Sequence, residues 1–157
     1  MREIEFRGKE TFDNEGNRPT GGSRWLYGSL ITHDGGITSI AGSREGSREG
    51  MRVGFNYDVI SETVGQYTGL YDKNGNKIFE GDILKIFHFI DGRRKKHFLY
   101  HVVQWSEKYT GWIAANNGQK DADPKNGSPQ LWCYVKNEFE IAGNIHDNPE
   151  LLEANNS

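Results

Sequence analysis

The chain has 157 residues, of which 34% are hydrophobic and 12% aromatic, with one cysteine and a formal net charge of −3. This length fits one domain or two small interlocked ones, and apolar residues spread along the chain exclude a disordered protein. The charge balance of the whole chain gives no sign of binding to nucleic acid or a membrane surface. A single cysteine excludes an internal disulfide, and no apolar run approaches the roughly 18 residues of a membrane span. The first residues have no signal-peptide pattern, so we expect a soluble cytoplasmic protein.

The N-terminal third predicts short strands joined by polar loops. Aromatic and branched residues favour strands at 4–7, 25–32 and 37–40, with a turn at Asp34–Gly36. We expect mobile loops at 8–24 and 42–50, the second holding a tandem Ser-Arg-Glu-Gly in which arginines and glutamates balance. Residues 51–67 fit helical spacing as well, but their branched residues favour strands. Residues 1–58 are thus predicted to form a small β subdomain.

The rest of the chain has clearer strand signals. Asn74–Gly75 predicts a hairpin with a type I′ turn, in which both residues need positive φ. Further strands are expected at 83–90, 97–105, 111–115, 131–135 and 139–142. A charged loop separates the first two, and a polar loop at 116–129 precedes the last two. Asn148 and Pro149 suit the start of a short terminal helix. Many short strands and tight turns are typical of a barrel or roll.

Three stretches of this sequence match a known family pattern: residues 2–7, 63–84 and 141–152. The central one reads Thr-Val-Gly-Gln-Tyr-Thr-Gly-Leu-Tyr-Asp-Lys-Asn-Gly-Asn-Lys-Ile-Phe-Glu-Gly-Asp-Ile-Leu. With these stretches the chain resembles the YopX-like family of phage and prophage proteins. The resemblance implies a mainly β protein of the bacterial cytoplasm, with an SH3-like barrel or roll over 59–157 intertwined with the smaller N-terminal subdomain. It implies no catalytic residue and no cofactor, because the family has no established activity.

The residues of the family motif are expected to be structural. Its glycines suit turns or bulges, and the two aspartates flank the predicted hairpin, where they can accept hydrogen bonds from backbone N–H groups. The motif residues are Gly65, Gln66, Tyr67, Thr68, Gly69, Asp72, Gly75, Glu80, Gly81, Asp82, Gly143 and Asn144.

Sites for metals and for nucleophilic catalysis find little support in the sequence. Asp72, Asn74 and Asn76 have the spacing of a calcium loop, but that loop also needs glycine at its sixth position and glutamate at its twelfth. His97 and His101 would lie about 13 Å apart on a strand, too far to share a zinc ion. There is no Gly-x-Ser-x-Gly motif. We therefore expect no metal and no cofactor, and an enzyme is the least favoured hypothesis.

The run Arg93-Arg94-Lys95-Lys96 is the one candidate binding site. Residues 83–105 hold five cationic residues against one acidic residue, and five aromatic rings flank the run: Phe87, Phe89, Phe98, Tyr100 and Trp105. Cations can neutralise phosphates and rings can stack on bases, so this segment could bind nucleic acid. If the rings belong to the core, the run is only a solvated loop. The favoured hypothesis is a non-enzymatic interaction module whose partner is another protein or a second copy; nucleic-acid binding is the alternative.

Overall fold

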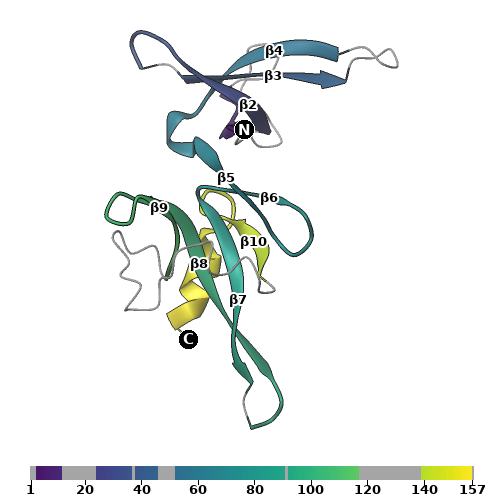
Figure 1. Ribbon diagram of the computed structural model, residues 1–157, viewed down its shortest axis with the longest axis vertical. Helices are drawn as coiled ribbons and strands as arrows, with labels where there is room; N and C mark the ends of the chain where they lie inside the picture. The colour runs from purple at the N-terminus through teal and green to yellow at the C-terminus, as the bar shows by residue number, and fades with distance from the viewer. Residues whose placement is uncertain are drawn as a thin grey trace. The chain divides into compact units, whose positions relative to one another are not determined.

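The computed structural model describes residues 3–11, 24–36, 38–45, 52–90, 92–116 and 139–156. It divides into two compact units, Met1–Tyr67 and Thr68–Ser157 (Figure 1). The division falls later than the sequence-based boundary after residue 58, because the chain keeps pairing with the first strand beyond that point. Ile60 donates its N–H to the carbonyl of Lys9, and Tyr67 donates to Glu5. Within the described ranges, no helix is long and apolar enough to cross a membrane.

Unit 1 is an antiparallel sheet in the order β4-β3-β2-β1, with the start of β5 beside β1. Its elements are β1 (Phe6–Lys9), β2 (Trp25–Thr32), β3 (Thr38–Glu45), β4 (Arg52–Val59), the 3-10 turn η1 (Ser61–Thr63) and the beginning of β5 (Gly65–Tyr71). The strand predicted at 25–32 is confirmed. The strand preference of 51–67 is confirmed at 52–59 and 65–67, whereas 61–63 form the 3-10 turn. Branched and aromatic side chains fit this half-buried pleated surface.

Two predicted loops of unit 1 are shorter than expected. β1 continues through Gly8 and Lys9, which pair with Leu26 and Trp25, although the loop was predicted from residue 8. β3 likewise continues to Glu45, although a loop was predicted from residue 42. Gly42 lies inside β3, where the ring of Phe55 occupies the space that a side chain at this position would need. Residues 12–23 and 46–50 of these loops lie outside the described residues.

The core of unit 1 is small and rich in rings, as the composition predicts. Leu26, Ile40 and Val59 are buried at its centre. Partly buried side chains pack around them: Phe6, Leu30, Phe55, Tyr57 and Val64. The rings of Phe55 and Tyr57 stack with centroids 5.7 Å apart. Each ring buries a large area, so a few of them stabilise a small sheet.

Unit 2 places the end of β5 beside β6 (Lys77–Phe79) and contains a second antiparallel sheet in the order β10-β7-β8-β9. The strands of this sheet are β7 (Asp82–Ile90), β8 (Lys96–Ser106), β9 (Gly111–Asn116) and β10 (Glu140–Asn144). The terminal helix is a 3-10 helix, η4 (Pro149–Asn156), which lies against β8. The strand predicted at 131–135 and Cys133 lie outside the described residues.

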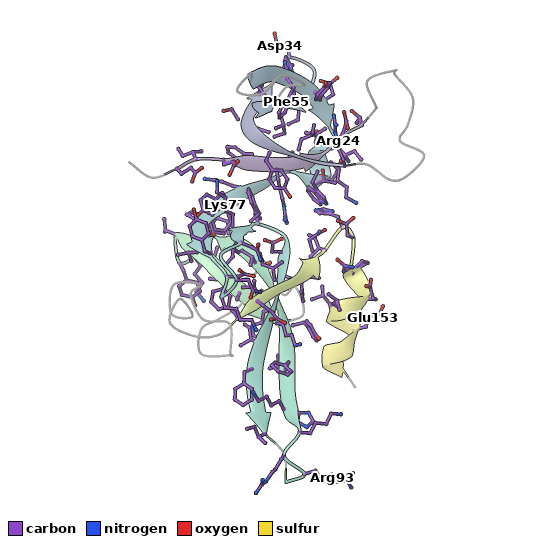
Figure 2. The ribbon with its side chains drawn as sticks, turned by 90° about the vertical axis from the view of Figure 1, so that its right-hand side faces the viewer. Arg24, Asp34, Phe55, Lys77, Arg93 and Glu153 are labelled. Atoms are coloured by element: carbon purple, nitrogen blue, oxygen red, sulfur yellow. The ribbon has the colours of Figure 1, made fainter. Side chains whose placement is uncertain are left out.

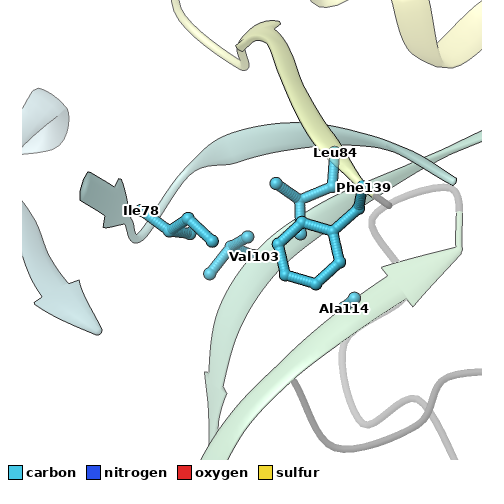
Figure 3. Close-up of a cluster of buried hydrophobic side chains, with 5 residues drawn as sticks. All are labelled: Ile78, Leu84, Val103, Ala114 and Phe139. Atoms are coloured by element: carbon cyan, nitrogen blue, oxygen red, sulfur yellow. The ribbon is translucent and has the colours of Figure 1, made fainter. Parts of the chain in front are cut away.

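The core of unit 2 lies between β6 and the sheet (Figure 3). Ile78, Leu84, Val103, Ala114 and Phe139 are its buried members. They come from β6, β7, β8, β9 and the residue before β10, so these side chains join β6 to a sheet with which it shares no hydrogen-bonded ladder. In both strand orders the described strands form open antiparallel sheets. The mainly β prediction is confirmed, whereas a closed barrel is not formed over these ranges.

The hairpin predicted at Asn74–Gly75 is present, but its turn is different. Gly75 has φ of 83°, whereas Asn74 has no positive φ, which excludes type I′. Gly75 donates its N–H to the carbonyl of Asp72, and Asp72 donates to the carbonyl of Asn76. This is the pattern of a three-residue loop that ends in a left-handed glycine. The wider loop is favoured because the Asp72 carboxylate accepts hydrogen bonds from the N–H groups of Asn74 and Asn76, both 2.9 Å.

Candidate functional site

The outer half of the β7–β8 hairpin is a two-stranded ribbon. β9 pairs with β8 only from His101 onward, and β10 pairs with β7 only as far as Lys85. Among the described residues, 86–90 and 96–100 therefore pair only with each other; we call them the distal ribbon. Figure 1 shows this hairpin extending beyond the rest of unit 2. A ribbon of this kind has both edges and much of both faces available to a partner.

The tip of the distal ribbon is cationic. Arg93, Arg94, Lys95 and Lys96 are all exposed, and Figure 2 shows Arg93 at the end of the hairpin, pointing away from it. Arg94 has φ of 61°, in the left-handed region that favours glycine. A register shift between Phe87 and Phe89 adds a bulge to β7 just before the tip. Bulges increase local twist and redirect side chains, so they are common where a strand presents a binding residue.

One face of the distal ribbon carries an exposed aromatic pair. Phe87 and Phe98 lie opposite each other in the ladder, with ring centroids 6.1 Å apart at 77°. Their exposed fractions are 46% and 38%, and Ile90 nearer the tip is 54% exposed. The ammonium of Lys85 lies 4.4 Å from the centroid of the Phe98 ring. Phe87 and Phe98 are therefore surface side chains, and Phe98 contacts a cation. The sequence had left open whether these two rings belong to the core.

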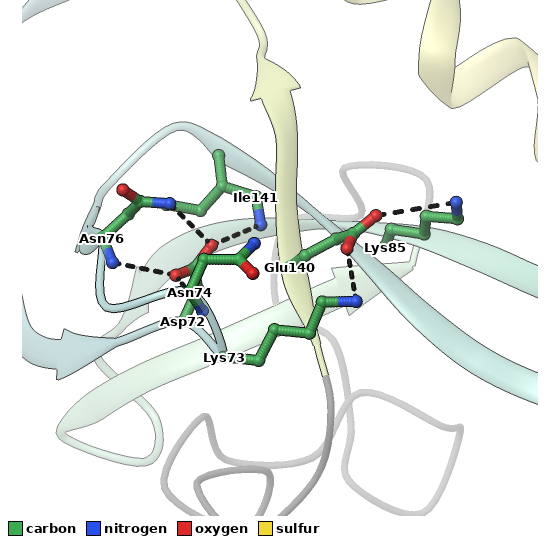
Figure 4. A network of polar contacts seen from close by, with 7 residues as sticks. All are labelled: Asp72, Lys73, Asn74, Asn76, Lys85, Glu140 and Ile141. Carbon is green, nitrogen blue, oxygen red and sulfur yellow. Dashed lines mark hydrogen bonds and ion pairs between the residues drawn. The ribbon is translucent and has the colours of Figure 1, made fainter.

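A polar network fixes Lys85 at the base of the distal ribbon (Figure 4). Its ammonium lies 3.6 Å from Glu140 Oε1, while Lys73 forms an ion pair with Glu140 Oε2. The hydrogen bond from Lys73 lowers the pKa of Glu140 most; burial opposes this, and the charges of Lys73 and Lys85 hold the pKa below 4.5. Glu140 thus stays ionised and keeps Lys85 beside the ring of Phe98.

The same network includes the aspartate of the predicted calcium loop. Asp72 Oδ2 accepts from the backbone N–H of Ile141 at 3.2 Å and from the carboxamide of Asn76, in addition to the two backbone hydrogen bonds within its own loop. Burial raises the pKa of Asp72, but the hydrogen bonds from Asn76, Ile141 and Asn74 outweigh it and hold the pKa below 3.8. Both oxygens are occupied by protein donors, so Asp72 joins the hairpin loop to β10 as a structural residue.

The other motif residues lie at turns and backbone contacts that are dispersed over the fold. Positive φ occurs at Gly69, Gly75 and Gly81, and the β10 ladder shifts register between Ile141 and Gly143. Side-chain oxygens of the motif bond backbone groups: Thr68 to the carbonyl of Ile78, Asp82 from the N–H of Phe79, and Asn144 from the N–H groups of His146 and Asp147. The remaining motif residues are in or beside strands: Gly65, Gln66, Tyr67 and Glu80. The structure does not gather them into one pocket.

The histidines do not form a metal site in the part of the chain that is described. His97 and His101 both lie on β8, and the Nδ1 of His101 is 3.3 Å from the carbonyl oxygen of Ala114. Among the described residues there is no group of three His, Cys, Asp or Glu side chains that could hold a metal ion.

Sequence patterns did not reveal two further side-chain clusters in unit 1. Ser39 Oγ donates to Asp58 Oδ1 at 2.7 Å, and His33 Nε2 lies 2.9 Å from the same Oγ. Nucleophilic catalysis needs the histidine to accept the serine proton, but here the serine donates to the aspartate and is 1% exposed. The guanidinium of Arg7, 6% exposed, lies 4.7 Å from the ring centroid of Trp25. Ser39 and Arg7 are buried, whereas His33 and Asp58 are exposed, so the one nucleophilic oxygen of the first cluster is the group that solvent does not reach.

Comparison with known proteins identifies the same family as the motif residues do. The model of the YopX protein family matches residues 23–153. The crystal structure of protein EF1440 from Enterococcus faecalis is similar to this chain with a TM-score of 0.53 at 23% sequence identity, over 97% of this chain and 99% of that one. At this identity the likeness is one of fold. No curated protein sequence matches the chain. Since the matched segment spans most of the sequence, including the distal ribbon, the protein belongs to the YopX family.

Proposed function

We propose that this protein is a non-enzymatic interaction module of phage or prophage origin, which acts in the bacterial cytoplasm and holds a macromolecular partner on the distal ribbon. The observation that carries the proposal is the Phe87–Phe98 pair, two adjacent rings that are each more than a third exposed. Exposed apolar patches rimmed by polar residues mark interaction sites on soluble proteins. Here Lys85 and the four cations of the tip form such a rim.

The architecture of unit 2 supports this proposal. A two-stranded ribbon is only marginally stable alone. An exposed ribbon in a folded protein is therefore better explained by binding than by a contribution to stability. The proposal includes an SH3-like roll in unit 2, in which the sheet and its buried core hold the base of the ribbon rigid while the outer half stays accessible. Phage origin and the cytoplasmic site of action rest on the family membership.

Enzymatic activity is less well supported by the described side chains. Asp72 and Glu140 are held in hydrogen bonds and ion pairs, and Asp82 is 1% exposed with its carboxylate bonded to the N–H of Phe79. A general acid or base must reach the proton that it transfers. These carboxylates are already bonded to groups of the protein, which fits a structural role.

Site-specific photocrosslinking in bacterial cells that express the gene tests the proposal. A photoreactive benzoyl-phenylalanine would replace Phe98 or Ile90 on the distal ribbon, and Tyr71, which is 50% exposed, as the control in the same unit. We expect adducts from positions 98 and 90 and few from position 71. Sensitivity of the adduct to protease or nuclease would identify the partner as a protein, a second copy or a nucleic acid. Equal yields at all three positions, or none on the ribbon, would refute the ribbon as the recognition element.

A further inference from the structure

We infer that the partner of the distal ribbon is a single-stranded nucleic acid, with its phosphates on the cationic tip and unpaired bases on the rings of Phe87 and Phe98. The inference rests on the proposed function, because it names the partner class for the same surface. It goes beyond the basic run, since it assigns binding to two rings whose exposure only the structure reveals.

Charge complementarity is the first argument. The chain as a whole is acidic, yet Arg93, Arg94, Lys95 and Lys96 are consecutive and exposed at the end of a projecting hairpin. At about 3.3 Å per residue, Lys96 lies roughly 7 Å along the strand from Phe98. A polyanion held at the tip would therefore have its neighbouring units over the rings. Cations attract phosphates whatever the base sequence, so this part of the surface supplies affinity that depends on salt.

The rings supply the second argument, because their arrangement suits stacking. Phe87 and Phe98 meet edge to face, an arrangement that leaves ring surface uncovered, as their exposure confirms. Base stacking on aromatic side chains is a main source of affinity for single strands and accepts every base, since each base has a π-face. The ammonium of Lys85 already lies over the Phe98 ring and beside Glu140, so a base would stack on the ring surface that Lys85 leaves exposed.

Single strands fit this surface better than a duplex or a protein does. Bases in a duplex are already stacked on one another, so rings can receive only bases that are unpaired. A two-stranded ribbon can enter the major groove, but phenyl rings offer no hydrogen bonds to the base edges that lie there. An acidic protein would satisfy the cations but would require no aromatic faces. In a single strand each nucleotide carries a phosphate for the cationic tip and an unpaired base for the rings, so one kind of ligand uses both parts of the surface.

Fluorescence anisotropy with the full-length chain tests the inference. The probes are fluorescein-labelled 12-nucleotide oligo(dT) and oligo(rU), a mixed-sequence single-stranded DNA and its duplex, each titrated at several salt concentrations. In the ring variant, Phe87→Leu with Phe98→Leu, the apolar contact remains and the aromatic faces are removed. In the rescue variant, Phe87→Tyr with Phe98→Tyr, stacking is retained. In the tip variant, Arg93, Arg94, Lys95 and Lys96 all become Ser. Tyr71→Ser is the control for an exposed ring elsewhere in the same unit.

We expect the wild type and the tyrosine variant to bind single strands at least tenfold more tightly than duplex. The leucine variant should lose about tenfold in affinity while its salt dependence is kept. The tip variant should show a shallower salt dependence, by about 0.7 for each phosphate contact removed. Comparison of oligo(dT) with oligo(rU) then separates DNA from RNA as the source. Thermal unfolding of each variant confirms that it is folded.

Several results would overturn the inference. Absence of binding at low salt would exclude nucleic acid; protein adducts from position 98 in the crosslinking experiment would then leave the proposed function standing with another partner. Equal affinity for duplex, or an unchanged affinity in the leucine variant, would reduce the site to nonspecific attraction of phosphates.

Discussion

The carboxylate of Asp72 accepts a hydrogen bond from the backbone N–H of Ile141, 69 residues further along the chain, at 3.2 Å. The contact closes unit 2, because it joins the β5–β6 loop to β10, and β10 pairs with the base of the distal ribbon. The same carboxylate orders its own loop through Asn74 and Asn76. One side chain thus links the strongest part of the family motif to the strand that supports the candidate site.

Replacement of this carboxylate should destabilise unit 2. Asp72→Ala removes four hydrogen bonds to a buried charged group and leaves backbone donors without their acceptor, so we expect a loss of about 3 kcal/mol in the free energy of unfolding. Urea unfolding followed by tryptophan fluorescence measures it. Glu153→Ala, at an exposed position of η4, is the control and should change stability by less than about 0.5 kcal/mol. A loss for Asp72→Ala no larger than that of the control would contradict the structural role.

Acid should weaken the same contacts. Burial raises the pKa of Asp72 but its hydrogen bonds hold it below 3.8, so the folded state favours the carboxylate. A depressed pKa contributes stability that is complete above the unfolded value and is lost as pH falls through the folded value. We therefore expect the free energy of unfolding to fall below about pH 4, and Asp72→Asn to flatten that decline. Urea midpoints between about pH 2 and pH 6 test this. Glu140→Gln should flatten it less, because solvent screens its ion pairs; identical acid limbs in all three proteins would refute it.

Backbone conformation alone should account for the need for glycine at position 75. A Cβ added to Gly75 would touch nothing, yet its φ of 83° is unfavourable for other residues. Gly75→Ala should therefore cost about 1 kcal/mol, and Gly75→Asn less, because asparagine tolerates the left-handed region. Gly92→Ala is the matched control: its Cβ also meets open space and its φ is not positive, so we expect no loss. Equal stability of the two alanine variants, by thermal or urea unfolding, would contradict the argument.

Local patterns predicted most strands correctly, because hydrophobic and branched residues mark a half-buried sheet wherever the partner strand lies. The failures have local physical causes. Gly8 and Gly42 begin the two predicted loops but lie in strands, where neighbouring side chains and backbone fill the space that a Cβ would need. Asn74–Gly75 suggested a two-residue turn, but the hydrogen bonds of Asp72 favour a wider loop. Of the two expected alternatives, barrel or roll, a closed barrel does not form over the described residues, since a pattern of strands does not specify which edges pair.

For the candidate site, the sequence predicted the cations and their place at a hairpin tip. It could not decide whether Phe87 and Phe98 are buried, because a run such as 83–90 is apolar on both faces in a core strand and in an exposed ribbon alike. Exposure depends on how far β9 and β10 pair along the hairpin, which is to His101 and Lys85 over the described residues. That limit comes from tertiary pairing, so no local signal could have supplied it.

The buried core of unit 2 should be far less tolerant than the distal ribbon. Leu84 is fully buried among Val103, Ala114 and Phe139, so Leu84→Ala should cost about 3 kcal/mol through the lost contacts and the cavity left behind. Ile90→Ala removes a similar volume from a side chain that is 54% exposed, and we expect a loss below about 1 kcal/mol. Urea unfolding of the two variants compares them directly. Similar losses would mean that the distal ribbon is packed against the fold and is not free to bind a partner.

Arg94 should lower the stability of the fold while its charge strengthens binding. Its φ of 61° is one that arginine adopts at a cost of about 1 kcal/mol, and strained residues of this kind persist where function requires them. Arg94→Gly should therefore raise the free energy of unfolding by up to about 1 kcal/mol, whereas Arg93→Gly, at a position without positive φ, should lower it by about 0.5 kcal/mol. Each variant loses one cation from the tip, so both should weaken binding to single-stranded oligonucleotides to a similar degree. Unfolding and anisotropy measured on the pair separate the two effects, since charge loss is matched and only the backbone strain differs. If Arg94→Gly were as destabilising as Arg93→Gly, the left-handed conformation would carry no strain, and the tip would show no sign of a residue retained there for binding.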